Sequence, residues 1–137
     1  MIREATKADI PAIRVLMGSE PGFWKQATRP EVLEIDLDSA KDLAIVWEES
    51  GEILGFACAH DVGFRAYLSE LIVSRTARGR GVGQRLVEHV EDRLRKRKCP
   101  VLFSDVWKEA EGFYRSLGWS APDVILLRKR LLSEKGT

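Results

Sequence analysis

The helical period of 3.6 residues recurs in four stretches of the chain, where apolar side chains return to one side of the predicted helix. These stretches cover residues 9–17, 31–37, 82–98 and 110–117. Asp9 is the expected N-cap of the first helix, with Pro11 in its first turn, where the missing N–H of proline costs nothing. Pro100 cannot continue the third helix, and Gly118 closes the fourth. We therefore expect about four helices.

Shorter runs rich in β-branched and other apolar residues predict strands between these helices. They cover residues 2–4, 43–47, 53–60, 66–73, 101–103 and 124–127. Ser50-Gly51 is a turn signal, so the second and third runs form a hairpin. Strands in hairpin order, followed by alternating helices and strands, predict an α/β fold with a mixed sheet and helices on both faces.

The composition is typical of one compact domain: 137 residues, 45% hydrophobic and 31% charged. No apolar run approaches the ~18 residues of a membrane span, and the charged N-terminus does not resemble a signal peptide. Cys58 and Cys99 lie in separate apolar segments, and we interpret them as reduced, mostly buried thiols. Two cysteines and two histidines scattered along the chain do not predict a metal site. We expect a cytoplasmic protein that contacts no membrane.

Charge is unevenly distributed although the net charge is only +1. From Arg75 to Lys98 there are nine basic residues and three acidic ones, whereas from Glu31 to Glu52 there are eight acidic residues and one lysine. This division favours an anionic ligand at the basic segment and a cationic one at the acidic segment, and the alternative is two solvated faces. Nucleic acid is disfavoured as a partner, because no aromatic residues interleave with the arginines.

The most informative segment is a glycine-rich loop that connects a strand to a helix. Leu71-Ile72-Val73 ends the strand, and Arg78-Gly79-Arg80-Gly81-Val82-Gly83 opens the helix. The glycines allow a tight turn, and the helix start presents free N–H groups and the positive end of its dipole to an anion. The spacing lacks the GxxxxGK[ST] of a P-loop, and Gln84 stands where a dinucleotide fingerprint needs its third glycine. The loop is thus predicted to bind another kind of phosphate.

Two motifs resemble the GNAT superfamily of acyl-CoA-dependent N-acyltransferases. Arg78-x-x-Gly81-x-Gly83 follows the family pattern [Q/R]-x-x-G-x-[G/A], and Phe113-Tyr114-x-x-x-Gly118-Trp119 follows a second signature. The resemblance covers nearly the whole chain and implies a single domain over residues 1–137. It also implies a mostly antiparallel sheet of six to seven strands, splayed at strands 4 and 5, with about four flanking helices.

The resemblance further implies acetyl-CoA as the co-substrate and a set of residues that bind it. The backbone of Leu71, Ile72 and Val73 is expected to pair with the pantetheine arm. The N–H groups of the loop are expected to hold the diphosphate, with charge added by Arg78, Arg80 and Arg85. The expected binding residues of this loop are Arg78, Gly79, Arg80, Gly81, Val82, Gly83 and Gln84.

Catalytic roles follow from the chemistry of acyl transfer to an amine, which needs a proton acceptor and a proton donor. Tyr114 is the candidate acid for the departing thiolate and, by resemblance to the family, an expected CoA-binding residue; the alternative is a core aromatic. Glu70 is the candidate base, expected to share a face of its strand with Leu68 and Ile72; the alternative is a structural acid, and His60 is a second candidate base. The resemblance also implies that a backbone N–H of Ile72 or Val73 is the oxyanion donor.

Two further features concern aromatic residues, one at a CoA-anchoring position of the family and the other in the acceptor segment. Trp107 stands where many relatives carry an asparagine that helps to anchor CoA, which is a departure from the family pattern. Phe23 and Trp24 lie in the segment where the family builds its acceptor site, and they either shape that pocket or cover the core.

The sequence therefore predicts an N-acetyltransferase that acts on a primary amine of a small molecule or peptide, with a cationic acceptor favoured by the acidic segment. The alternative is a non-catalytic acetyl-CoA sensor of the same fold. A monomer and a homodimer both remain open.

Overall fold

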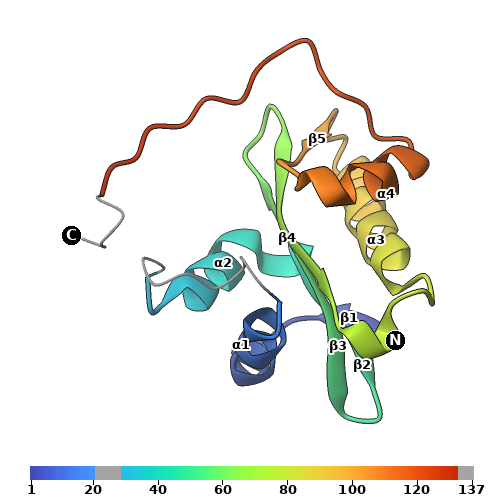
Figure 1. Ribbon diagram of the computed structural model, residues 1–137. Coiled ribbons are helices and arrows are strands. Elements are labelled where there is room, and N and C mark those ends of the chain that lie inside the picture. The colour runs from blue at the N-terminus through green and yellow to red at the C-terminus, as the bar shows by residue number, and fades with distance from the viewer. Residues whose placement is uncertain (21–28, 133–137) are drawn as a thin grey trace.

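The computed structural model describes residues 1–20 and 29–132, which form one mixed sheet with helices on both faces (Figure 1). The strand order is β1-β2-β3-β4-β5, with antiparallel pairing from β1 to β4 and parallel pairing between β4 and β5. The strands are β1 (Ile2–Glu4), β2 (Ala44–Glu49), β3 (Glu52–Asp61), β4 (Ala66–Val73) and β5 (Leu102–Phe103). The helices are α1 (Ile10–Gly18), α2 (Val32–Ala40), α3 (Val82–Lys96) and α4 (Glu111–Ser116). The predicted α/β class, mixed sheet and four helices are confirmed.

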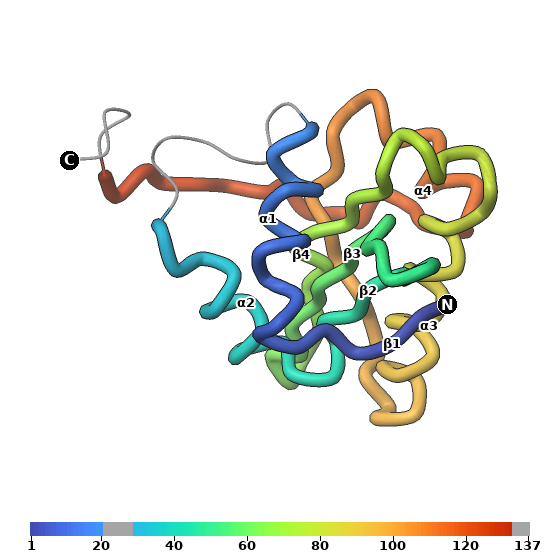
Figure 2. The backbone as a smooth tube through the Cα atoms, turned by 90° about the horizontal axis from the view of Figure 1, so that it is seen from below, coloured from blue at the N-terminus to red at the C-terminus, as the bar shows by residue number. Residues whose placement is uncertain are grey.

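The helices form two layers, with α1 and α2 on one face of the sheet and α3 and α4 on the other (Figures 1 and 2). Asp9 is the N-cap of α1 and Pro11 lies in its first turn, as the sequence predicts. The apolar stripe of α3 is buried from Val82 to Leu94, and this burial holds the helix against β3 and β4. No helix among the described residues is long and apolar enough to cross a bilayer.

The prediction of six to seven strands is wrong, since the described residues form five. The segment 124–127 was expected to be a strand, but residues 120–132 are exposed and outside the sheet. A strand needs a hydrogen-bonding partner, which local apolar character alone does not supply.

β4 and β5 separate soon after they meet. Their pairing joins only Ala66 to Leu102 and Tyr67 to Phe103. Beyond Tyr67, the edge of β4 that faces β5 has no strand partner among the described residues, up to its end at Val73. This divergence leaves main-chain groups of β4 available at the place where α3 begins.

A β-bulge at Ser69 interrupts the ladder between β3 and β4. Glu70 lies opposite Cys58, but Leu68 lies opposite Ala59, so Ser69 has no partner of its own. Directly opposed residues share a face and neighbouring residues on β3 point to opposite faces. Glu70 therefore shares a face with Ile72 but not with Leu68, and the expectation for Leu68 was wrong because simple alternation does not continue through a bulge.

Candidate functional site

The loop between β4 and α3 takes the conformation that its glycines allow. Gly79 and Gly81 have φ angles of 78° and 79°, in the left-handed region that favours glycine. Gly81 is the N-cap of α3, and no side chain caps the helix. The first N–H groups of α3 therefore have no partner from a capping side chain and are available to an anion.

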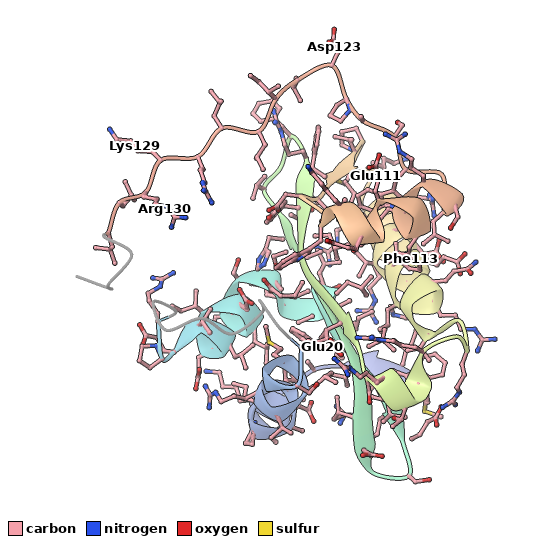
Figure 3. All side chains as sticks on the ribbon, viewed as in Figure 1. Glu20, Glu111, Phe113, Asp123, Lys129 and Arg130 are labelled. Atoms are coloured by element: carbon pink, nitrogen blue, oxygen red, sulfur yellow. The ribbon has the colours of Figure 1, made fainter. Side chains whose placement is uncertain are left out.

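A cavity of about 410 Å³ lies between the end of β4 and the start of α3. Its lining includes nine of the expected binding residues: Leu71, Ile72, Val73, Arg78, Gly79, Gly81, Val82, Gly83 and Gln84. Three further lining residues were not predicted: Glu20, Ala77 and Phe113 (Figure 3 labels Glu20 and Phe113). Phe113 belongs to the second motif and was within reach of sequence reasoning, whereas nothing in the sequence pointed to Glu20.

Glu20 brings a negative charge into this basic cavity. Its carboxylate accepts a hydrogen bond from Arg78 and lies 3.7 Å from Nε of Arg75. Nε of Arg78 also donates to the carbonyl of Val73, at 3.3 Å. With only 10% of its side chain exposed, Glu20 holds Arg78 in place, and an anion that enters the cavity must compete with it for that arginine.

The other arginines of the loop point elsewhere. Arg80 forms an ion pair with Glu49, and the guanidinium of Arg85 lies 5.8 Å from the ring centroid of Trp47. Arg80 and Arg85 do not line the cavity, contrary to what their position in the sequence suggested. The groups at this cavity that suit an anion are thus the main-chain N–H groups of the loop and Arg78.

A polar cluster surrounds Glu70 on the face of the sheet that α2 covers. The bulge directs Ser69 and Glu70 to this face, where Asp36 of α2 and His60 of β3 also lie. Burial raises the pKa of Glu70 to about 8, and the neighbouring Asp36 carboxylate contributes to the rise. Glu70 is therefore largely protonated at neutral pH and is able to exchange a proton near physiological pH.

Hydrogen bonds connect Glu70 to the surface through three side chains. Ser69 Oγ donates to Glu70 Oε1 at 2.7 Å and lies 2.9 Å from His60 Nε2. His60 Nδ1 lies 2.8 Å from the hydroxyl of Ser39, which is exposed at the end of α2. The cluster therefore contains a continuous route for a proton between Glu70 and solvent. His60 was predicted as a candidate base, but Ser69, Ser39 and Asp36 were not predicted to belong to the site.

The same cluster contains donor atoms that a metal ion accepts. Ligand atoms of Asp36, Cys58, His60 and Glu70 lie within 4.8 Å of one another. Burial raises the pKa of the Cys58 thiol far above its usual range, so Cys58 is a neutral thiol in the metal-free protein. Both ring nitrogens of His60 already face serine hydroxyls. In the metal-free protein, these side chains therefore form a hydrogen-bonded network.

Tyr114 is nearly buried, at 9% exposure, and does not line the cavity, although the neighbouring Phe113 does. Its ring packs edge-on against Phe113 and Trp119, each with a centroid distance of 5.2 Å. Burial raises the pKa of its phenol to about 12, so it remains protonated at neutral pH. These contacts are those of a core aromatic, which was the alternative interpretation of Tyr114. The protonated phenol is also what a proton donor needs.

The acidic segment is largely neutralised by local ion pairs. Asp42 pairs with Arg93 and Arg97, and Glu48 pairs with Arg3. Asp36 is the member of the segment that belongs to the cluster around Glu70. Trp107 is exposed, and Phe23 and Trp24 lie outside the described residues.

Comparisons with known proteins identify the family of this chain. The profile of the Acetyltransferase (GNAT) family matches residues 10–119. The chain is 33% identical over 110 residues to "Acetyltransferase ECA0875" of Pectobacterium atrosepticum, covering 77% of this chain and 78% of that protein. It is 30% identical over 135 residues to "Peptidyl-lysine N-acetyltransferase YiaC" of Escherichia coli, covering 90% and 85%.

Solved structures show the same fold at lower identity. A transcriptional regulator from Bacillus halodurans C-125 superposes with a TM-score of 0.77 at 22% identity, over 95% of this chain and 99% of that one. AAC(6')-Iy in complex with the bisubstrate analog CoA-S-monomethyl-acetylneamine superposes with a TM-score of 0.73 at 22% identity, over 95% and 97%. The match over most of the chain and the identities of 30% and 33% show that this protein belongs to the GNAT family of acetyltransferases and is an acyltransferase enzyme.

Proposed function

We propose that the protein transfers an acetyl group from acetyl-CoA to a primary amine, which attacks the thioester directly in a ternary complex. The observation that carries this proposal is the uncapped N-terminus of α3 at one end of a 410 Å³ cavity, with the free edge of β4 beside it. A helix start of this kind suits a diphosphate, and a free strand edge suits an amide-bearing arm.

In this proposal, the backbone of Leu71, Ile72 and Val73 pairs with the pantetheine amides. The N–H groups from Arg78 to Gly83 hold the diphosphate, and Arg78 exchanges Glu20 for a phosphate oxygen. The known complex of AAC(6')-Iy with a CoA-derived bisubstrate analog supports the ligand class for this fold.

The chemistry requires few groups from the protein. The neutral amine attacks the thioester carbonyl, a backbone N–H of Ile72 or Val73 stabilises the oxyanion, and the thiolate leaves. Glu70 accepts the proton that the amine loses, because the pKa of about 8 gives this carboxylate useful basicity near neutral pH. Tyr114, whose phenol is protonated at neutral pH, donates a proton to the thiolate.

The hydrogen-bonded chain supplies an exit for the proton. Protonated Glu70 passes its proton to Ser69 Oγ while Ser69 passes its own to Nε2 of His60. His60 then releases the proton on Nδ1 toward Ser39 and water, which returns Glu70 to the carboxylate. Asp36 Oδ1, 3.9 Å from Nε2, stabilises the histidine while it carries both protons.

The acceptor we propose is a cationic primary amine, on a peptide or a small molecule. The carboxylate of Asp36 attracts an ammonium group toward Glu70, the group that takes up its proton. One relative is named as a peptidyl-lysine N-acetyltransferase, and AAC(6')-Iy is named as an aminoglycoside N-acetyltransferase, so both names imply such an amine.

Thiol release from acetyl-CoA tests this function with a lysine peptide, an aminoglycoside, a polyamine and a neutral aromatic amine. We expect turnover with at least one cationic amine, and a fall of about 10²-fold or more in Glu70→Gln. Acetylation restricted to the neutral amine would reject the cationic acceptor. Tight CoA binding without turnover of any amine would favour the non-catalytic sensor.

A further inference from the structure

The cluster around Glu70 combines four side chains of the types that bind zinc. Cys58 and His60 are two positions apart on β3, so they point to the same face of the sheet. Glu70 lies opposite Cys58 on β4, and Asp36 comes from α2, which packs over β3. One thiol, one imidazole and two carboxyl groups thus converge from three elements that are separated along the chain. This set suits Zn²⁺ and Co²⁺ better than Mg²⁺ or Ca²⁺, which prefer oxygen ligands.

The spacing of the four ligand atoms is close to that of a tetrahedral zinc site. Nε2 of His60 lies 3.7 Å from Sγ of Cys58 and 3.9 Å from Oδ1 of Asp36. All four atoms, including a carboxyl oxygen of Glu70, lie within 4.8 Å of one another. Bonds of about 2.3 Å to sulfur and about 2.0–2.1 Å to nitrogen or oxygen place the ligand atoms of tetrahedral zinc about 3.3–3.6 Å apart. Side-chain rotations are therefore sufficient to close the four atoms around one ion.

The thiol of Cys58 has weak contacts in the metal-free protein. Cys58 is fully buried, and its Sγ lies 3.9 Å from the carbonyl oxygen of Asp36 and 3.7 Å from Nε2 of His60. A thiol is a poor hydrogen-bond donor, so contacts of this length stabilise it little. Zinc offers the same sulfur a coordinate bond in place of these contacts.

His60 is already oriented as a zinc ligand through its second ring nitrogen. A histidine that binds a metal through one nitrogen donates the N–H of the other to an oxygen atom, which fixes its tautomer. Nδ1 of His60 lies 2.8 Å from the hydroxyl of Ser39, which supplies this oxygen. Nε2 then exchanges its contact with Ser69 for the ion. The side chains of Asp36 and His60 are each 16% exposed, so an ion reaches the cluster from solvent on this side.

We propose that Asp36, Cys58, His60 and Glu70 form a zinc site that competes with the proton route from Glu70. When Zn²⁺ binds, the Cys58 thiol and the Glu70 carboxyl each release one proton to water. The carboxylate of Asp36 and the neutral imidazole bind without losing a proton, so the net charge of the cluster does not change. Bound zinc occupies the carboxylate that accepts the proton and the Nε2 that relays it, and turnover stops. This inhibition rests on the proposed function, whereas zinc binding does not.

Cobalt spectroscopy tests the site without acetyl-CoA or an amine. One equivalent of Co²⁺ should give the visible bands of tetrahedral cobalt and a near-ultraviolet thiolate-to-cobalt band, and Zn²⁺, which binds more tightly, should remove both. Cys58→Ala should lose the thiolate band. His60→Gln should weaken Zn²⁺ binding by at least the roughly 10–100-fold that loss of an outer-shell partner costs. Cys99→Ala and His89→Gln are the matched controls, since they change the other cysteine and the other histidine and should keep the wild-type spectrum.

Ser39→Ala keeps the test decisive if the variants in the buried cluster do not fold. Ser39 is exposed at the end of α2, so its replacement should leave the fold intact. The variant removes the hydrogen-bond acceptor of Nδ1 and should weaken Zn²⁺ binding by about 10-fold. A folded wild type that gives no thiolate band would overturn the zinc site. A band that Cys99→Ala removes, or that persists in Cys58→Ala, would overturn it as well.

Inhibition is measured separately, as formation of the acetylated amine, because zinc also binds the thiol of free CoA. Zinc at one equivalent per chain should stop turnover by the wild type, and a chelator should restore it. Cys58→Ala should need about 10-fold more zinc or higher for the same inhibition. Turnover that continues while the thiolate–metal bond is formed would keep the zinc site but would reject Glu70 and His60 as the proton route.

Discussion

Replacing Glu70 with glutamine should stabilise the protein while it removes most of the activity. A carboxyl group whose pKa rises from 4.5 to about 8 on folding binds its proton more tightly in the folded state. The unfolded chain therefore releases this proton at a lower pH than the folded protein does. As a result, the free energy of unfolding falls as the pH rises from about 4.5 to about 8, and it is lowest above that range. Glutamine keeps the shape of the side chain and removes this pH dependence.

The shift sets an upper limit of about 5 kcal/mol on the gain, because each pKa unit corresponds to about 1.4 kcal/mol. Glu70 and Asp36 share the cost of ionising two neighbouring carboxyl groups, and the amide group of glutamine still needs hydrogen-bond partners. We therefore expect the free energy of unfolding to rise by about 1–2 kcal/mol at pH 9. Such a gain raises Tm by several degrees, roughly 3–8 °C for a domain of this size. At pH 4.5, where the carboxyl is protonated in the folded state and half protonated in the unfolded chain, the variant and the wild type should differ by only about 0.4 kcal/mol from this effect.

Thermal melts at pH 4.5, 7 and 9 and initial rates of thiol release measure the two effects on the same samples. Glu52→Gln is the control, since Glu52 is an exposed carboxyl at the start of β3 and should change neither quantity. If the Glu70→Gln variant loses stability equally at all three pH values, the claim that Glu70 is a buried carboxyl with a raised pKa would be refuted. A variant that keeps full activity would assign the proton acceptor to another group.

Three further predictions concern the rest of the site. Glu20→Gln should tighten CoA binding by about 5-fold, since it removes a negative charge and releases Arg78, and calorimetry that finds equal or weaker binding would contradict this role. His60→Ala should slow turnover by about 10-fold and make the rate depend on imidazole concentration, as expected when an external buffer replaces a proton relay; a slow variant insensitive to imidazole would indicate a structural role only. Tyr114→Phe should lower kcat by about 10-fold or more with KM for acetyl-CoA nearly unchanged, and a variant with unaltered kcat would leave Tyr114 as a core aromatic.

The local features of this protein follow from its sequence because they depend on neighbouring residues. The apolar stripe of α3, the proline in the first turn of α1 and the glycine-rich loop all appear where the pattern predicts them. Nine of the expected binding residues line one cavity for the same reason, since they form two short runs on either side of one turn.

The features that the sequence did not predict depend on contacts between distant segments. Glu20 meets Arg78 across 58 positions, and Asp36 reaches Glu70 only because α2 packs over β3. The bulge at Ser69 is a property of two strands together, so the alternation of one strand could not predict that Leu68 faces away from Glu70. The apolar run 124–127 was expected to be a strand in its own sheet, but in the described chain it has no partner.

Titration calorimetry with CoA tests the central claim, that main-chain N–H groups at the start of α3 bind the diphosphate. The wild type should bind one CoA per chain with a dissociation constant in the range of about 1 μM to 1 mM. Gly81→Ala places a side chain at a φ of 79°, so it should weaken binding by about 10-fold while the protein stays folded. Absence of heat with folded wild type, or equal affinity in Gly81→Ala, would contradict the proposed cradle.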